Sequence, residues 1–238
     1  MKEFINQIQK EAKSNQIKLN EKQAELFYKY MELLLEWNEK INLTAITDRE
    51  GIILKHFIDC ITIMPYLKED NKIIDIGTGA GFPGIPIKIM SEKAEVCLMD
   101  SLNKRIKFLD EVIEKLELKN IKTIHARAEE LARDKKQREQ YDVATSRAVA
   151  KLNTLLEYML PFVKVGGKCI CMKSNNIEEE LEESKKAIKI LGGEIEKIEQ
   201  IPIANTDIIR KFVIIKKVKP SPKEFPRKAG TPTKKPIK

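Results

Sequence analysis

The 238-residue chain has no long hydrophobic run, and this excludes several classes of protein at the outset. None of its apolar stretches approaches the ~18 residues that a membrane-spanning helix requires. The first residues, MKEF at 1–4, lead into no hydrophobic segment of the kind found in a secretory signal peptide. We therefore expect a cytoplasmic protein that does not associate with a membrane.

Cysteine and histidine are scarce, and neither forms a metal-binding pattern. The four cysteines, Cys60, Cys97, Cys169 and Cys171, lack the spacing of a metal site. With only two histidines in the chain, a zinc site is not expected either. Disulfide bonds are rare in intracellular proteins. We therefore expect a protein with neither a bound metal nor a disulfide framework.

Basic residues exceed acidic residues by eight, and the surplus is confined to the C-terminal end. Residues 216–238 carry nine basic residues and one acidic residue, whereas residues 1–215 carry 35 of each charge. A Pro-rich segment of this composition buries too little apolar surface to fold by itself. A basic tail at 219–238 would suit the phosphate backbone of a nucleic acid. A solubilising, disordered end is the alternative that composition leaves open.

Residues 1–70 have the pattern of a helical extension. Asn20 and Gln23 have the spacing of a capping box, in which each side chain bonds the backbone N–H of the other residue. Apolar residues then recur at helical spacing up to Ile41, which indicates a stripe that faces a core. Asp48 is placed to cap a second helix that carries His56 and Phe57.

From residue 71 to residue 218 the pattern alternates between strands and helices. Short apolar runs lie at 72–76, 95–99, 121–125, 141–145 and 168–173, with helical patterns between them, clearest at 103–118 and 178–191. Such alternation predicts an α/β domain with a mostly parallel sheet. Residues 194–203 and 209–217 then predict an antiparallel hairpin at one edge. Five parallel strands with this hairpin match the seven-stranded, Rossmann-like sheet of class I methyltransferases.

A glycine-rich turn, DIGTGAGF at 75–82, lies between the first predicted strand and a predicted helix. Glycines at such a turn allow the backbone to approach a nucleotide-type ligand. The position at which a dinucleotide-binding turn has its third glycine is Phe82, and Asp75 precedes the first glycine. The pattern resembles the first motif of S-adenosylmethionine-dependent methyltransferases, whose ligand carries a cationic amino-acid end that a nearby carboxylate would suit.

Residues that could contact such a ligand follow the first four predicted parallel strands. In open α/β sheets, ligands bind at the carboxyl ends of the strands. The candidates are Gly77, Gly79 and Phe82 after the first strand, Asp100 at the end of the second, Ala128 and Glu129 after the third, and Arg147 after the fourth. An acid at position 100 would accept hydrogen bonds from ribose hydroxyls. Read singly, Asp100 could be a helix cap, Glu129 a solvated charge and Arg147 one half of an ion pair.

Matching segments extend along nearly the whole chain. They are WN at 37–38, NLT at 42–44, HFID at 56–59, DIGTGAGFPGIP at 75–86, DSLNKR at 100–105, FL at 108–109, RAE at 127–129, SRA at 146–148, Arg210, and PRKAGTP at 226–232. With these segments in this order, the chain resembles the ribosomal RNA small subunit methyltransferase G family, also called glucose-inhibited division protein B. It departs from the family pattern at 174–176, where Ser-Asn-Asn replaces a glycine, and at Phe225, which replaces a tyrosine.

The resemblance implies transfer of a methyl group from S-adenosyl-L-methionine to N7 of a guanine at position 527, in the 530 loop of bacterial 16S ribosomal RNA. It implies that Gly77, Phe82, Asp100, Ala128, Glu129 and Arg147 are cofactor-binding positions. The partner would be 16S ribosomal RNA, presented as the free RNA, the 30S subunit or its assembly intermediate. Arg147 would orient the substrate or the cofactor, and we expect a monomer.

The residues present fit methylation at N7 better than other nucleobase methylations. Guanine N7 bears a lone pair and no proton, so this reaction needs orientation rather than a general base. Methylation of a pyrimidine carbon needs a cysteine nucleophile, whereas Cys97, Cys169 and Cys171 fall inside predicted strands. Exocyclic-amine methylases commonly have a Pro-Pro-aromatic loop after the fourth strand, where this chain has Ser146-Arg147-Ala148.

Other functions are left open by the residues. A nicotinamide-dependent oxidoreductase could share the sheet, although Phe82 and Asp75 argue against it. A non-catalytic RNA- or ribosome-binding protein could retain the fold. A methyltransferase acting on another RNA or on a small molecule is the remaining alternative. If RNA is the substrate, Lys104, Arg105, Lys107 and the tail are the candidate contacts.

Overall fold

The structure, a computed structural model, describes residues 1–174 and 177–238. Its N-terminal part is helical and comprises α1 (Lys2–Ser14), α2 (Glu21–Ile41), α3 (Arg49–Gly51), the π-helix η1 (Ile52–Ile58), α4 (Asp59–Ile61) and the 3-10 helix η2 (Met64–Tyr66). Both predicted helix starts are confirmed. Asn20 and Gln23 form the reciprocal capping box, and the Asp48 carboxylate accepts a hydrogen bond of 2.7 Å from the N–H of Gly51.

A seven-stranded sheet follows, in the order β3-β2-β1-β4-β5-β7-β6. The strands are β1 (Lys72–Ile76), β2 (Glu95–Asp100), β3 (Ile121–His125), β4 (Tyr141–Arg147), β5 (Val163–Lys173), β6 (Gly193–Pro202) and β7 (Ile209–Lys217). The first five are parallel, and β7 is antiparallel to both β5 and β6. This confirms the predicted parallel sheet with an antiparallel hairpin at its edge.

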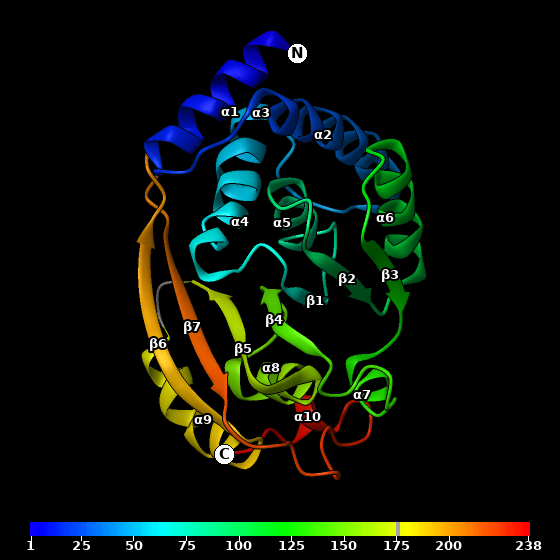
Figure 1. Ribbon diagram of the computed structural model, residues 1–238, viewed down its shortest axis with the longest axis vertical. Helices are drawn as coiled ribbons and strands as arrows, with labels where there is room; N and C mark the ends of the chain where they lie inside the picture. The colour runs from blue at the N-terminus through cyan, green and yellow to red at the C-terminus, as the bar shows by residue number, and fades with distance from the viewer. Residues whose placement is uncertain (175–176) are drawn as a thin grey trace.

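Helices cover both faces of the sheet. They are α5 (Gly84–Met90), α6 (Asn103–Lys115), α7 (Ala128–Leu131), α8 (Leu152–Met159), the 3-10 helix η3 (Leu160–Phe162), α9 (Glu178–Ile190) and α10 (Thr231–Lys234). One core joins the N-terminal helices, α5 and α6 to one face, and a second core joins α8 and α9 to the other. Figure 1 shows these two groups of helices on opposite sides of the strands.

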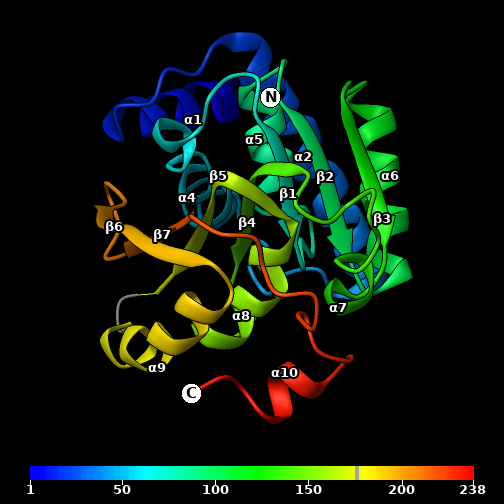
Figure 2. The ribbon, with the colours of Figure 1, turned by 60° about the horizontal axis from the view of Figure 1, so that its bottom comes forward.

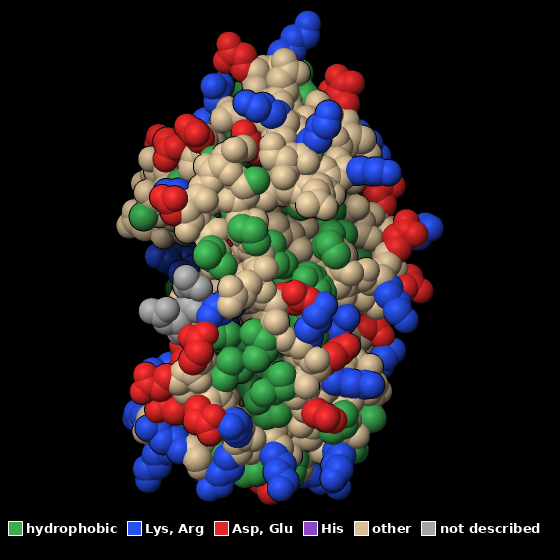
Figure 3. Space-filling view, turned by 90° about the vertical axis from the view of Figure 1, so that its left-hand side faces the viewer, with side chains coloured by type: hydrophobic (Ala, Val, Ile, Leu, Met, Phe, Trp, Pro, Cys, Tyr) green, Lys and Arg blue, Asp and Glu red, His purple; other side chains and the backbone are tan. Residues whose placement is uncertain are grey.

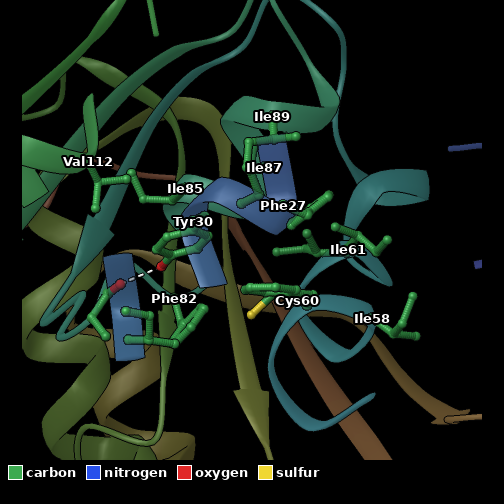
Figure 4. Close-up of a cluster of buried hydrophobic side chains, with 14 of the residues drawn as sticks. Phe27, Tyr30, Ile58, Cys60, Ile61, Phe82, Ile85, Ile87, Ile89 and Val112 are labelled. Carbon is green, nitrogen blue, oxygen red and sulfur yellow. Dashed lines mark hydrogen bonds between the residues drawn. The ribbon is translucent and has the colours of Figure 1, made fainter. Parts of the chain in front are cut away.

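The N-terminal helices also support the glycine-rich turn. Tyr30 of α2 is fully buried, and its hydroxyl donates a hydrogen bond to the carbonyl of Ala80, inside the turn (Figure 4). The Tyr30 ring lies 5.3 Å from that of Phe57 and 5.6 Å from that of Phe82. The predicted core stripe of α2 is buried or partly buried along its length, and its member Tyr30 fixes the backbone of the turn.

The C-terminal tail is docked on the body of the protein. After β7 the chain passes beside α7 to α10, and α10 and the C-terminus lie below α8 in Figure 2. The guanidinium of Arg138 donates hydrogen bonds to the carbonyls of Ser221 and Phe225, each 2.8 Å long. A disordered end, the alternative left open by composition, is therefore wrong for this structure, because contacts with the body hold the segment that could not fold by itself.

Neither a membrane-spanning helix nor a metal cluster is present in the described residues. Within residues 1–174 and 177–238, no helix has both the length and the hydrophobicity needed to cross a membrane. Over the same ranges, no group of three or more His, Cys, Asp or Glu side chains converges as a metal-ion site would require.

Candidate active site

Two adjoining cavities lie at the carboxyl ends of the parallel strands. The first, of about 390 Å³, is bordered by the glycine-rich turn, and we call it the turn cavity. The second, of about 210 Å³, is bordered by Gly230 and Thr233, and we call it the tail cavity. Both are lined by Gly77, Ser101 and Val149, so they are two parts of one crevice.

Every site residue predicted from the sequence lines this crevice. Gly77, Gly79, Phe82, Asp100 and Arg147 border the turn cavity. Gly77 borders the tail cavity as well, together with Ala128 and Glu129. A cavity of about 510 Å³ between α2, α5 and α6 contains none of these residues. The strand ends therefore converge as the topology predicted.

The turn leaves room for a ligand beside its backbone. Gly79 has φ +63°, and a Cβ added there would meet no atom within 4 Å. Gly77 has φ +66°, but a Cβ there would lie 2.8 Å from the Val149 side chain. The open space is thus beside Gly79, whereas Gly77 permits close approach of the loop after β4.

Asp75 does not face the cavities, which corrects the expectation that its carboxylate would attract the ligand. The side chain is fully buried. Its Oδ2 accepts hydrogen bonds of 2.6 Å from the Thr78 hydroxyl and 2.8 Å from the N–H of Gly84, at the start of α5. Burial raises the pKa of Asp75 to about 7, against the lowering effect of these two bonds. Asp75 therefore joins the two ends of the turn from beneath.

Asp100 is held at the end of β2 by its neighbours. One carboxylate oxygen accepts a 2.9 Å hydrogen bond from the N–H of Gly79, and the other accepts one from Leu102. The guanidinium of Arg105 approaches to 3.2 Å and is partly exposed. The two backbone bonds fix the orientation of the carboxylate, and Arg105 lies beside it at the edge of the turn cavity.

Arg147 lies between the glycine-rich turn and the π-helix η1. Its guanidinium donates a 2.9 Å hydrogen bond to Asp59, which is fully buried, and lies 4.8 Å from the centre of the Phe82 ring. Asp59 also accepts two hydrogen bonds from Arg210, of 2.7 and 2.8 Å. The ion pair that the sequence allowed as an alternative for Arg147 is present, but the side chain lines the turn cavity as well.

His56 completes this wall of the turn cavity. Its ring stacks on Phe82 at 4.6 Å between centres. Its Nδ1 lies 3.2 Å from Arg147 Nη2 and 3.1 Å from the carbonyl of Lys55. Its Nε2 lies 2.7 Å from the Thr44 hydroxyl. Burial and the Arg147 charge lower the pKa of His56 to about 4, so the ring is neutral at physiological pH.

Glu129 borders the tail cavity and contacts the tail directly. The side chain is buried, and its Oε1 accepts a hydrogen bond of 2.9 Å from the N–H of Gly230. The alternative that Glu129 is a solvated surface charge is therefore wrong. Ala128, its neighbour at the start of α7, is also buried.

The cysteines are unsuited to nucleophilic catalysis. All four are free and buried. Burial raises the pKa of Cys60 and of Cys171 to about 12. A thiolate is the reactive form, so these thiols act as apolar side chains.

The family model for rRNA small subunit methyltransferase G matches residues 23–209 of this chain. The chain belongs to this family. The ribosomal RNA small subunit methyltransferase G of Clostridium tetani is 54% identical over 224 residues, which cover 93% of this chain and 94% of the relative. The ribosomal RNA small subunit methyltransferase G of Acetivibrio thermocellus is 55% identical over 222 residues, which cover 93% of this chain and 91% of the relative. The resemblance and the enzyme class inferred from the sequence are thereby confirmed.

Solved structures of low sequence identity share the fold. M. jannaschii TYW2 in complex with AdoMet superposes with a TM-score of 0.55 at 18% identity, covering 73% of this chain and 80% of that protein. A SAM-dependent methyltransferase from Aquifex aeolicus also superposes with a TM-score of 0.55, at 19% identity. The superposition covers 72% of this chain and 94% of that protein. The predicted class I, Rossmann-like methyltransferase fold is confirmed.

Residues that the sequence did not predict as part of the site complete the wall around Arg147. Asp59, Thr44 and Tyr30 contact Arg147, His56 and the turn, respectively. The signal for Asp59 was the segment HFID at 56–59, which places two polar side chains, His56 and Asp59, three residues apart in a largely apolar helical segment. Of the departures from the family pattern, Ser174 and Phe225 are described, whereas Asn175 and Asn176 lie outside the described residues.

Proposed function

We propose that the protein transfers a methyl group from S-adenosyl-L-methionine to N7 of the guanine at position 527, in the 530 loop of bacterial 16S ribosomal RNA. The observation that carries this proposal is the convergence of the predicted cofactor-binding residues on one crevice, in a chain of the rRNA small subunit methyltransferase G family.

The crevice fits an S-adenosyl group by its shape and by its polar groups. The turn cavity offers open backbone at Gly79 and a carboxylate at Asp100, held in place by backbone N–H groups. The tail cavity offers the buried carboxylate of Glu129 and the small side chain of Ala128. We assign the amino-acid end and the ribose to the turn cavity and the adenine to the tail cavity. The binding residues are then Gly77, Gly79, Phe82, Asp100, Ala128, Glu129 and Arg147.

In this reaction the protein has to orient the methyl donor and the guanine. S-adenosylmethionine, when bound, supplies an electrophilic methyl group on a positively charged sulfur. Guanine N7 presents its lone pair without loss of a proton, so none of these residues has to act as a base. Arg147, fixed by Asp59 and stacked on Phe82, orients the substrate or the cofactor at the mouth of the turn cavity. His56 is neutral, and its ring stacks on Phe82 beside Arg147.

The RNA would approach over α6 and the tail. Lys104 and Lys107 are exposed on α6, and Arg105 lies at the edge of the turn cavity. Lys and Arg side chains also gather at the lower end of the face shown in Figure 3, the end at which Figure 1 places the C-terminus. Folded RNA is recognised mainly through phosphates, shape and splayed bases, which suits such a surface.

Three further features belong to the proposal. Residues 1–70 would form a helical extension, 71–218 the methyltransferase domain and 219–238 the basic tail. The protein would act in the cytoplasm as a monomer, without a metal. Its substrate would be 16S RNA, as the free RNA, the 30S subunit or its assembly intermediate.

The test is radiolabelled methyl transfer to 30S subunits that lack the modification, followed by mapping of the modified base. We expect label at a single guanine N7 in the 530 loop. Label at another nucleotide, or in a small molecule, would instead support the alternative of a methyltransferase with a different substrate. Thermal stabilisation by S-adenosylhomocysteine but not by NAD would separate this enzyme from a dehydrogenase on the same fold.

A further inference from the structure

The tail cavity is formed by two parts of the chain that are far apart in sequence. Its inner wall consists of the ends of β1 and β2, the segment after β3, and Tyr158 of α8. Its outer wall includes Gly230 and Thr233 of the C-terminal tail. The body alone therefore leaves this side of the crevice open, and the tail closes it.

The tail is held in this position by a buried ion pair. Glu157 of α8 is fully buried, and Arg227 donates to both of its oxygens, with Nη2 at 2.6 Å and Nε at 2.9 Å. The backbone N–H of Arg227 donates to the same carboxylate at 2.8 Å. Two guanidinium bonds and one backbone bond to one carboxylate fix both the position and the direction of the chain at this point.

Three contacts then place the tail against the cavity. Gly230 adopts φ +79°, a conformation that favours glycine, and directs its N–H to Glu129. Beyond it, the hydroxyls of Thr233 and Tyr158 lie 2.9 Å apart. The carbonyl of Pro232 accepts a hydrogen bond from Thr154. Each contact joins a residue of the tail to a residue beside or beneath the tail cavity.

We propose that residues 227–238 form the outer wall of the adenine subsite, so that cofactor binding requires the docked tail. This rests on the proposed function, because it assigns the adenine to the tail cavity. One side of the tail would thus contact the cofactor, and the other side would contact RNA. Gly230 and Thr233 face the cofactor, whereas Lys228, Lys234 and Lys235 are exposed and accessible to RNA.

Because linkage is reciprocal, a cofactor that binds better to the docked tail must also favour docking. RNA that holds the tail lysines in the docked position would then raise the affinity for the cofactor. The same residues would connect the two substrates of the reaction.

The first experiment compares the full chain with a chain truncated after Pro226, in the absence of RNA, by calorimetric titration. We expect the affinity for S-adenosylhomocysteine to fall about tenfold or more, as removal of about one or two buried polar interactions would produce. 5′-Methylthioadenosine, which lacks the amino-acid end, should bind more weakly by the same factor, because the missing wall touches only the adenosine part. A variant with Lys223, Lys228, Lys234 and Lys235 changed to Gln is the matched control and should bind both ligands as the unmodified chain does.

The second experiment uses the intact chain and does not depend on the stability of the truncated one. S-adenosylhomocysteine should slow tryptic cleavage after Lys228, but not after Lys18, which is exposed between α1 and α2. If the truncated chain does not fold, the protection of Lys228 in the intact chain decides whether the tail is part of the cofactor site.

The possible outcomes separate the two proposals. Equal affinities in both chains, or no protection at Lys228, would show that the tail is not part of the site while leaving the proposed function intact. Weaker binding of S-adenosylhomocysteine but not of 5′-methylthioadenosine would also overturn the inference, since the tail would then act on the amino-acid end. No binding of either ligand to the full chain would overturn the proposed function itself.

Discussion

The guanidinium of Arg147 donates a 2.9 Å hydrogen bond to the carboxylate of Asp59, which is fully buried. The bond connects the end of β4 to the start of α4. It fixes a cation at the edge of the turn cavity that would otherwise be free to move among several rotamers. The same carboxylate binds Arg210 of β7, so one acid anchors two arginines, of which only Arg147 lines the turn cavity.

This arrangement provides a matched pair of variants. Arg147→Ala and Arg210→Ala each remove one partner of Asp59, and we expect each to lower the free energy of unfolding by about 3 kcal/mol. Only Arg147→Ala should also lower the rate of methyl transfer, by about 100-fold, because only Arg147 borders the reacting groups. Urea unfolding and single-turnover transfer to 30S subunits measure the two effects. Equal decreases of transfer in the two variants would mean that Arg147 acts only through the fold.

Two glycines with similar backbone conformations test the space beside the turn. Gly79 and Gly166 have φ +63° and +90°, and a Cβ at either position would meet no protein atom within 4 Å. Alanine at either should therefore cost on the order of 1–3 kcal/mol of stability through backbone strain. We expect only Gly79→Ala to weaken binding of S-adenosylhomocysteine, since Gly166 lies within β5, away from both cavities. Calorimetric titration checks this, and equal affinity in both variants would place the ligand elsewhere.

Much of the site could be predicted because the ends of buried strands can be recognised in the sequence. Asp100, Glu129 and Arg147 each follow an apolar run of strand length, and the parallel topology brings such ends together at one edge. The glycines of the turn carry their own signal, because positive φ and close backbone approach both favour glycine. These inferences needed only local patterns and a topology rule. The roles of the residues as cofactor contacts stay predictions.

The remaining features depend on contacts between segments that local patterns do not encode. Asp75 precedes the turn, which predicts a ligand contact, but its carboxylate is buried and bonds Thr78 within the turn and Gly84 at the start of α5. The charge of the tail predicts how it behaves in solution, whereas its position is set by Glu157 and Arg138, each at least 70 residues before its partners in the tail. The composition of the tail indicates whether it could fold by itself. It does not indicate whether the folded body of the protein has a surface on which the tail can dock.

The buried carboxyl of Asp75 should make stability depend on pH in a defined direction. Its pKa is raised to about 7 from an ordinary value of 3.8, so between these values the folded chain retains a proton that the unfolded chain releases. Its contribution to stability is present below about pH 4 and is lost as the pH rises through 7. Relative to the unmodified protein, Asp75→Asn should therefore gain stability as the pH rises from 5 to 8. Urea unfolding at both values checks this, and a constant difference would show that Asp75 is ionised throughout.

His56 should remain neutral to unusually low pH. The pKa of His56 is lowered to about 4 from 6.5. Between pH 4 and 6.5 the unfolded chain therefore binds a proton at this ring, whereas the folded chain does not. The stability of the fold should fall as the pH drops from 6.5 towards 4. Nitrogen-15 NMR of the imidazole should show a ring that stays neutral as the pH falls through 6.5. Because the chain has only two histidines, a His125→Gln variant leaves a single ring to follow. A ring that titrates near 6.5 would contradict the buried contact with Arg147.

The basic tail allows local charge to be distinguished from net charge in RNA binding. Lys223, Lys228, Lys234 and Lys235 are exposed in the tail, and Lys2, Lys10, Lys13 and Lys18 are exposed on and after α1, at the opposite end of the molecule in Figure 1. Changing either set to Gln removes four positive charges. If the tail binds phosphates, only the first set should reduce the slope of log affinity against log salt, by about 0.7–0.9 for each phosphate that is no longer neutralised.

The two sets separate the explanations because long-range attraction depends on the total charge, whereas counterion release depends on the phosphates that are neutralised. Filter binding to 16S RNA between 50 and 300 mM salt measures both slopes. The same reduction in both variants would mean that the net charge of +8 attracts the RNA and that the tail has no special role in binding it. A reduction confined to the tail set would place the RNA beside Gly230 and Thr233, where the outer wall of the tail cavity lies.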